Sequence, residues 1–184
     1  PERALEFTGF TKDKPVIMII GGSLGAAAVN DAVRAVLPEL LKTFQVIHLC
    51  GKGKLDESLK NTKGYVQYEY IKKELADLFA LADVVISRAG ANAICELSAL
   101  KKPNLLIPLS ARASRGDQIL NARSFERMGY SVVLEEEEIT NEKLLETIHS
   151  LYKNRASYAD AMSKSKLTDS IEEIVRLFEQ AVNK

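Results

Sequence analysis

The stretch Pro15–Ala26, PVIMIIGGSLGA, decides the fold. It joins a nearly unbroken apolar run, Pro15–Ile20, to a glycine-rich loop and then to the start of an alanine-rich helix. An unbroken apolar run indicates a strand that is covered on both faces. Glycines let the backbone turn sharply and approach a ligand closely. Because the helix begins directly after the loop, its free N–H groups suit an anion such as a diphosphate, to which the Ser23 hydroxyl can donate. A tight turn of an ordinary α/β protein explains the glycines of this loop equally well.

Short β-branched runs alternate with longer helical patterns along the rest of the chain. The expected strands are Pro15–Ile20, Gln45–Cys50, Tyr65–Tyr68, Val84–Ser87, Asn104–Ile107 and Ser131–Leu134. The expected helices are Ala26–Leu41, Ile71–Leu81, Asn92–Leu100, Asp117–Met128, Asn141–Lys153 and Asp169–Asn183. This alternation predicts the α/β class, with a Rossmann-like doubly wound parallel sheet of about six strands. No repeat or low-complexity linker interrupts it, so we expect one domain over residues 1–184.

The overall composition excludes several classes of protein. Lys+Arg and Asp+Glu balance at 25 each, so the chain lacks the basic excess of a phosphate-tracking nucleic-acid binder. No apolar run approaches the ~20 residues of a membrane span. Cys50 and Cys95 lie in apolar stretches without CxxC spacing, which favours buried, reduced thiols in a cytoplasmic protein.

The glycine-rich loop also matches motifs of other enzymes. Gly21–Gly25 fits G-x-S-x-G, the nucleophile elbow of serine hydrolases. An elbow normally follows several strands, whereas this loop follows the first, and both histidines, His48 and His149, are more simply structural. A dinucleotide fingerprint would need G-x-G-x-x-G and an acidic residue ending the second strand, and a P-loop would need G-x-x-x-x-G-K-[ST]. The sequence has neither pattern.

Two further loops carry polar residues at strand ends. In an open parallel sheet, ligands bind beyond the carboxyl ends of the strands, which here means the loops after Ile20, Ser87 and Ile107. Asn92 opens a helix after the second of these loops, and Glu96 lies one turn along it, where a carboxylate can accept from two ribose hydroxyls. Asp117 and Gln118 open the helix after the third and can bind sugar hydroxyls. Taken singly, a first-turn glutamate or an N-cap aspartate explains these residues equally well.

Three motifs in this order carry a family resemblance: GGSLGA at 21–26, SRAGANAICE at 87–96 and GDQILNA at 116–122. They resemble the C-terminal domain of the MurG-type N-acetylglucosaminyltransferases, and the similarity runs from about Phe7 to Ile148. The resemblance implies one half of a GT-B fold, with UDP-N-acetylglucosamine as the partner of this half. A lipid-linked acceptor and the catalytic base would belong to an N-terminal domain that precedes this chain.

The resemblance also implies a role for individual residues. Gly22 shapes the phosphate loop, Ser23 contacts the donor phosphates, and Ile71 presents its backbone to uracil. Ala91 and Asn92 offer helix N-terminal amides to the diphosphate, and Glu96 holds the ribose hydroxyls. Asp117 and Gln118 address the N-acetylglucosamine ring. The family often has Gln or His in place of Asp117 and carries an Asn-Pro-x-Arg segment before the first strand, whereas this chain begins with Pro1-Glu2-Arg3.

The implied reaction is an inverting transfer of N-acetylglucosamine from UDP-N-acetylglucosamine to lipid I, which forms lipid II for peptidoglycan. We expect no catalytic residue, no cofactor and no metal ligand in this chain, which has no D-x-D motif. The whole protein is expected at the cytoplasmic face of the plasma membrane. Three alternatives stay open: the donor-binding subunit of a split transferase, a GT-B enzyme with another acceptor, and a hydrolase using Ser23.

Overall fold

A computed structural model describes residues 1–21, 26–111, 116–164, 176, 179 and 180. Six parallel strands form one sheet in the order β3-β2-β1-β4-β5-β6. The strands are β1 (Val16–Ile20), β2 (Gln45–Leu49), β3 (Tyr65–Tyr68), β4 (Val84–Ser87), β5 (Asn104–Leu106) and β6 (Ser131–Val133). The predicted doubly wound α/β sheet is confirmed, and the order of its strands reverses between β1 and β4.

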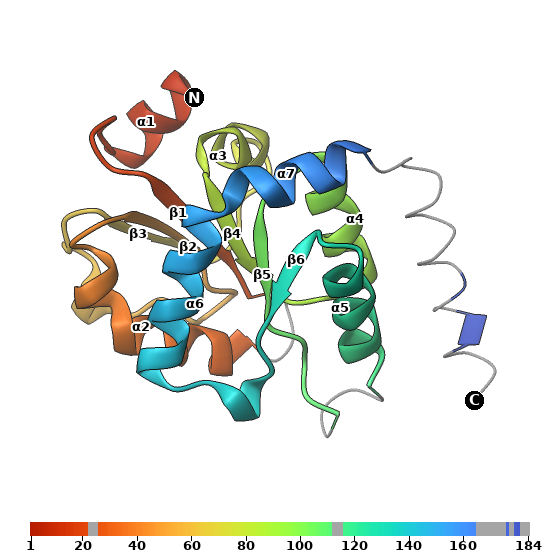
Figure 1. The fold of residues 1–184 in the computed structure, drawn as a ribbon. Coiled ribbons are helices and arrows are strands. Elements are labelled where there is room, and N and C mark those ends of the chain that lie inside the picture. Colours follow the sequence, from red (N-terminus) through yellow and green to blue (C-terminus); the bar gives the residue numbers. More distant parts are fainter. Residues whose placement is uncertain (22–25, 112–115, 165–175, 177–178, 181–184) are drawn as a thin grey trace.

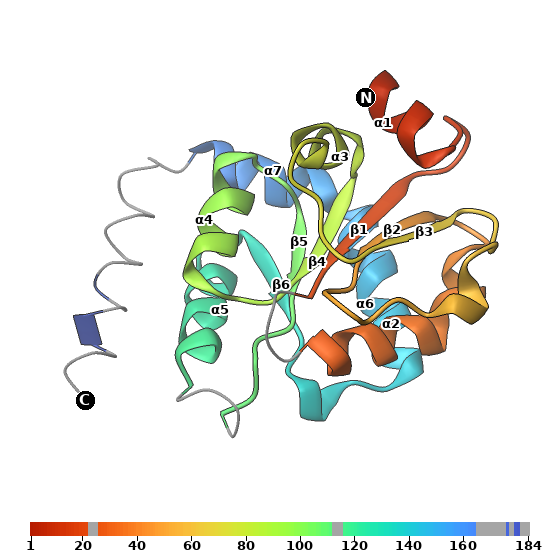
Figure 2. The same cartoon turned by 180° about the vertical axis from the view of Figure 1, so that it is seen from behind.

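Helices cover both faces of the sheet (Figures 1 and 2). They are α1 (Glu2–Thr8), α2 (Ala26–Leu40), α3 (Leu75–Leu81), α4 (Ala91–Ala99), α5 (Asp117–Arg127), α6 (Asn141–Lys153) and α7 (Arg155–Lys164), with short 3-10 turns at η1 (Glu57–Leu59) and η2 (Glu136–Glu138). One apolar cluster lies between the sheet and α2 with α6, and the other between the sheet and α1, α3, α4, α5 and α7.

Alternation along β1 explains the two clusters. Ile17 and Ile19 enter the cluster below α2 and α6, whereas Val16 and Met18 enter the opposite one, and all four are at most 2% exposed. Successive side chains of a strand point to opposite faces, so a strand buried on both faces is apolar throughout. The unbroken run VIMII therefore identifies a central strand.

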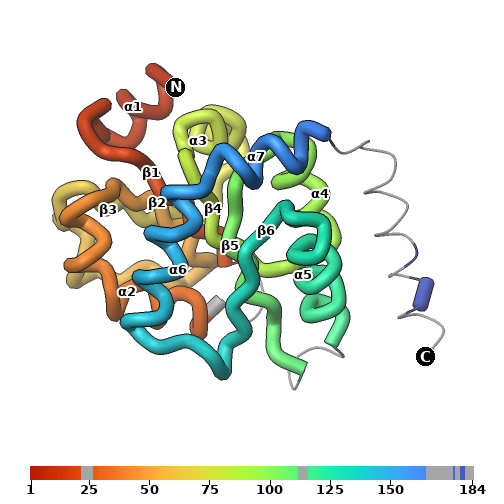
Figure 3. The backbone as a smooth tube through the Cα atoms, in the orientation of Figure 1, coloured from red at the N-terminus to blue at the C-terminus, as the bar shows by residue number. Residues whose placement is uncertain are grey.

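The helices differ from the sequence prediction in one boundary and in two helices that were not predicted. The helix predicted from Ile71 begins only at Leu75, and residues 72–74 form a bend and a turn. Neither α1 nor α7 was predicted; α7 carries the chain from α6 across to the other layer (Figure 3), where Met162 is buried. Most of the predicted helix Asp169–Asn183 lies outside the described residues.

Candidate functional site

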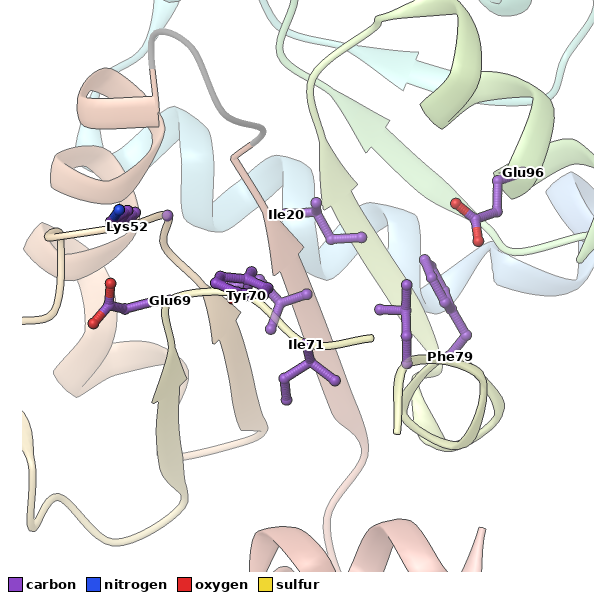
Figure 4. Close-up of a pocket in the computed structure, with 10 residues that line it drawn as sticks. Ile20, Lys52, Glu69, Tyr70, Ile71, Phe79 and Glu96 are labelled. Atoms are coloured by element: carbon purple, nitrogen blue, oxygen red, sulfur yellow. The ribbon is translucent and has the colours of Figure 1, made fainter. Parts of the chain in front are cut away.

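A cavity of about 400 Å³ opens at the carboxyl ends of β1, β2 and β3, in front of α3 and α4. We call it the strand-end pocket, and Figure 4 shows its lining residues. The described residues that line it are Ile20, Leu49, Gly51, Lys52, Glu69, Tyr70, Ile71, Leu75, Phe79 and Glu96. Its volume lies in the range of sites for small organic ligands. It adjoins the point between β1 and β4 where doubly wound sheets bind ligands.

The pocket has an apolar interior and charged ends. Ile20, Leu75 and Phe79 supply apolar surface, and Tyr70 lies at the rim with 70% of its surface exposed. Figure 4 shows Lys52 and Glu69 at one end and Glu96 at the other. Such a space suits a flat ring that is covered on its faces and carries polar groups at its edge.

Ile71 shows why the predicted helix start was wrong. Its side chain packs against the core and lines the pocket, so its apolar character reflects the cavity wall and not a helix face. Neither the N–H nor the C=O of Ile71 has a hydrogen-bond partner in the part of the chain that the structure describes. A backbone donor and acceptor are therefore available together on the wall of the pocket.

The start of α4 is an uncapped helix N-terminus. Gly90, which has no side chain, occupies the N-cap position with φ −67° and ψ 150°, and no described side chain makes a capping hydrogen bond there. The first hydrogen bond runs from the Ile94 N–H to the Gly90 carbonyl at 3.1 Å. Among the described residues, the N–H groups of Ala91, Asn92 and Ala93 have no partner. Free amides and the positive end of the helix dipole together make a place where an anion is stabilised.

Glu96 lies one turn further along α4, and its exposed side chain lines the strand-end pocket. It forms no salt bridge with any described residue. A carboxylate accepts up to four hydrogen bonds and donates none when ionised. Glu96 can therefore accept from two neighbouring hydroxyls of one ligand. Ala91 and Asn92 are not among the residues that line the pocket; they form the first turn of α4, ahead of Glu96, which does line it.

Gln118 ties two strand-end loops together. Its Oε1 accepts from the Leu109 N–H at 2.9 Å and from the Ala89 N–H at 3.3 Å, so it joins the loops after β4 and β5. This modifies the expectation of an amide that both donates and accepts, because its oxygen is already used. Its Nε2 lies near Gly90 and has no acceptor within the described chain. Gln118 can therefore offer a ligand donor groups only.

Asp117 is the exposed first residue of α5. It does not cap that helix, because Gly116 takes the N-cap position with φ 86° and no side chain makes a capping hydrogen bond. Asp117 and Gln118 both lie outside the lining of the strand-end pocket. Gly22 and Ser23 lie outside the described residues.

Arg88, directly after β4, holds several of the strand-end loops together. Its side chain is 5% exposed, and its Nη1 lies 2.6 Å from a carboxylate oxygen of Glu136. The same nitrogen donates to the carbonyls of Ile107 at 3.1 Å and Pro108 at 3.3 Å. A paired and hydrogen-bonded guanidinium can stay buried. Arg88 thus fixes the chain after β5 and the chain after β6 relative to the start of α4.

His48 belongs to a buried polar cluster below α2. Its Nδ1 lies 2.7 Å from the Tyr65 hydroxyl and its Nε2 lies 2.7 Å from Asn30 Oδ1. The Asn30 Nδ2 in turn donates to the Cys50 carbonyl at 2.9 Å. Burial, helped by the nearby Arg34 charge, lowers the pKa of His48 from 6.5 to about 3. His48 is structural, as predicted from its place in a strand.

The remaining candidates for proton transfer or thiol chemistry are also structural. His149 lies on α6, and its ring packs against Phe44 at 5.3 Å. Both cysteines are free thiols, with Cys50 buried and Cys95 half-buried, and burial raises the pKa of each. In the described part of the chain, no group of three or more His, Cys, Asp or Glu residues could hold a metal ion. No helix among the described residues has the length and apolar character needed to cross a membrane.

The pocket includes residues that the sequence analysis missed. Lys52 and Glu69 follow β2 and β3, whose loops were not among the three expected to carry the site. The sequence signal was a lysine between two glycines directly after a strand, in Gly51-Lys52-Gly53. Tyr70 also escaped notice because it was placed beside a predicted helix.

Comparison with known proteins decides the family. The glycosyltransferase family 28 C-terminal domain matches residues 16–176. The chain belongs to this family. The MurG-type resemblance found in the sequence is thereby confirmed for this family 28 domain.

The relatives carry the name UDP-N-acetylglucosamine–N-acetylmuramyl-(pentapeptide) pyrophosphoryl-undecaprenol N-acetylglucosamine transferase. The protein of that name from Lachnospira eligens is 62% identical over 173 residues, which cover 94% of this chain and 49% of the relative. The one from Clostridium perfringens is 57% identical over 182 residues, which cover 99% and 51%. The chain thus spans about half the length of the curated relatives it matches.

Solved structures share the fold of this family 28 domain. Acinetobacter baumannii MurG superposes with a TM-score of 0.71 at 23% identity, covering 92% of this chain and 51% of that one. The spinosyn forosaminyltransferase SpnP has a TM-score of 0.66 at 18% identity, covering 97% and 46%. At these identities the similarity concerns the GT-B architecture alone.

Proposed function

We propose that this chain is the donor-binding half of an inverting N-acetylglucosaminyltransferase, which transfers N-acetylglucosamine from UDP-N-acetylglucosamine to lipid I. The observation that carries the proposal is the strand-end pocket, where the unbonded Ile71 backbone and the unpaired Glu96 carboxylate lie beside the uncapped start of α4. The name of the Lachnospira eligens relative, which is 62% identical over 94% of the chain, supports the same donor and acceptor.

The three features fit the three parts of the donor in order. Uracil presents a carbonyl and an N–H at one edge, which match the free N–H and C=O of Ile71. The ribose hydroxyls match Glu96, and the diphosphate matches the amides of Ala91 and Asn92 together with Gly22 and Ser23 after β1. Gln118, whose free Nε2 is a donor, addresses an oxygen of the sugar beside Asp117.

The chemistry requires stabilisation of the leaving diphosphate as negative charge grows on it. Amide donors at a helix start are oriented before the reaction and act on that charge without reorganising. Each helix terminus contributes about 0.3–2 kcal/mol, depending on its burial. A base for the acceptor hydroxyl is a separate requirement, and we assign it to the N-terminal half of the enzyme, at the cytoplasmic face of the plasma membrane. This chain alone is therefore expected to bind the donor and to catalyse nothing.

Calorimetric titration of the chain with UDP-N-acetylglucosamine, UDP and ADP tests the proposal. The two uridine nucleotides should bind and ADP should bind more weakly, because the Ile71 backbone matches the uracil edge. Glu96→Ala removes charge-assisted hydrogen bonds worth about 1.5–3 kcal/mol, a loss in affinity of roughly tenfold to a hundredfold.

Glu142→Ala is the matched control for Glu96→Ala, because it removes an exposed glutamate from the first turn of α6 instead. It should bind both uridine nucleotides like the parent. If no heat is detected at millimolar UDP-N-acetylglucosamine while circular dichroism shows the fold intact, the donor-binding proposal is wrong. If Glu96→Ala and the parent bind equally well, the ribose assignment fails.

A further inference from the structure

Lys52 is the only basic side chain among the described residues that line the strand-end pocket. Two carboxylates, Glu69 and Glu96, line the same pocket. Without Lys52 the charged groups of the described lining would all be negative. Such a pocket would repel a polyanion, since like charges at short range raise its energy. The proposed donor carries its charge on a diphosphate, so the cation at this position has a direct electrostatic consequence.

The backbone around Lys52 forms a tight turn between two glycines. Gly51 and Gly53 both adopt left-handed conformations, with φ 93° and φ 72°, so the chain turns sharply on either side of the lysine. The Lys54 N–H donates to the Gly51 carbonyl at 3.1 Å and closes this turn. Most residues with a Cβ would be strained at the two flanking positions.

Hydrogen bonds from both neighbouring layers hold the turn in place. On the sheet side, the Gly53 N–H donates to Glu69 Oε2 at 2.9 Å, and the Gly51 N–H donates to the Glu69 carbonyl at 3.0 Å. On the helix side, the Arg34 guanidinium donates to the Lys54 carbonyl at 2.8 Å. The position of the Lys52 backbone is thus defined before any ligand binds, which lowers the entropic cost of using its side chain.

The same bonds place the turn beside the first turns of α2. Asn30, one turn into α2, donates to the Cys50 carbonyl at 2.9 Å. The Gly21 N–H, directly after β1, donates to the Leu49 carbonyl at 3.3 Å, so β1 and β2 end side by side. Lys52 therefore follows β2 next to the strand that leads into α2. The proposed function puts the donor phosphates at the start of α4 and at Gly22 and Ser23, which follow β1 in the sequence.

Lys52 has no competing partner among the described residues. Its side chain is exposed, and it forms no salt bridge and no hydrogen bond with the residues that the structure describes. An unpaired ammonium with three donors, on an ordered turn at the mouth of a pocket, is free to bind an anion.

We propose that the Lys52 ammonium binds the diphosphate of the donor and supplies the one formal positive charge of the described lining, opposite the two negative charges of Glu69 and Glu96. The inference rests on the proposed function and adds to it a binding residue from the loop after β2. Helix termini carry only about half a charge each. A lysine supplies a full charge, and it acts on the product UDP as well as on the intact donor.

Titration of the parent, Lys52→Ala and Lys54→Ala with UDP and with uridine tests the inference. Lys52→Ala should weaken UDP binding by about tenfold to a hundredfold, the range of a hydrogen bond between charged groups. It should leave uridine binding unchanged, because uridine has no phosphate. Lys54→Ala removes an exposed lysine of the same turn and should bind both ligands like the parent. Raising the NaCl concentration from 50 mM to 500 mM should narrow the difference between the parent and Lys52→Ala for UDP, because salt screens exposed charges.

Each other result has a definite meaning. If Lys52→Ala binds UDP as tightly as the parent, or loses UDP and uridine in equal proportion, Lys52 does not bind the diphosphate. If the parent itself binds UDP no more tightly than uridine, the donor-binding proposal fails, independently of Lys52. Far-ultraviolet circular dichroism of each variant shows that the loss is not one of folding.

Discussion

Acidification should destabilise this domain through His48. The side chain is completely buried, and its pKa is lowered from 6.5 to about 3 because burial disfavours the charged imidazolium. The unfolded chain therefore binds a proton near pH 6.5, whereas the folded protein does not bind it until the pH approaches 3. Stability from this group is complete above pH 6.5 and falls as the pH drops towards 3.

The size of the effect follows from the two pKa values. Each pH unit below 6.5 costs about 1.4 kcal/mol until the folded protein also takes up the proton. Between pH 7 and pH 5 the loss is about 2 kcal/mol. With a urea m-value of about 2 kcal/mol/M, the unfolding midpoint should move by about 1 M.

Urea unfolding followed by circular dichroism at pH 7, 6 and 5 measures this loss. His48→Gln keeps a donor and an acceptor near Asn30 and Tyr65 but cannot titrate, so it should be less stable at pH 7 and lose less stability on acidification. His149→Gln removes the other imidazole, which is exposed on α6 and packs against Phe44, and is the control for the loss of a histidine as such; it should lose more stability on acidification than His48→Gln does. Parallel loss of stability in the parent and His48→Gln would refute the reasoning, because all other titrating groups are common to both proteins.

Two further substitutions test the helix starts. Gln118→Leu removes the acceptor of the Ala89 and Leu109 N–H groups and should lower the free energy of unfolding, measured in urea, by about 1–3 kcal/mol. The control Asp117→Ala changes the exposed neighbouring residue and should stay within about 0.5 kcal/mol of the parent. Equal stabilities of the two variants would show that the hydrogen bonds of Gln118 contribute nothing. Thr140→Ala removes the side chain that caps α6 by accepting from the Lys143 N–H at 3.1 Å, and should cost about 1 kcal/mol in the same assay. An unchanged urea midpoint would contradict the capping role.

The central strands could be predicted because burial on both faces leaves a plain signal in the sequence. β1 and β4 are apolar runs with no alternation, and the structure buries almost every residue in them. The rule that ligands bind beyond the carboxyl ends of parallel strands then pointed to the loops after these two strands, without knowledge of any contact. The starts of α4 and α5 could also be predicted, because each helix begins directly after a glycine and glycines mark turns between elements.

The missed features share a physical cause. Ile71 is apolar because it lines a cavity, and a periodic pattern cannot distinguish a residue that faces a ligand from one that faces the core. Lys52 becomes a site residue only because β2 lies next to β1, and the order of strands in a sheet cannot be read from apolar periodicity. The short helix α1 buries only Ala4 and Thr8, which is too little for a pattern to reveal.

The guanidinium of Arg88 has a consequence for exchanging parts between related transferases. It donates to the carbonyls of Ile107 and Pro108 and forms a salt bridge with Glu136. One buried side chain therefore connects three segments that are distant along the chain. A chimera that takes the segment after β5 or β6 from a relative in which that segment does not bind Arg88 would leave a buried guanidinium without its partners. Recombination between family members should therefore tolerate crossover points outside residues 88–136 far better than crossover points within them.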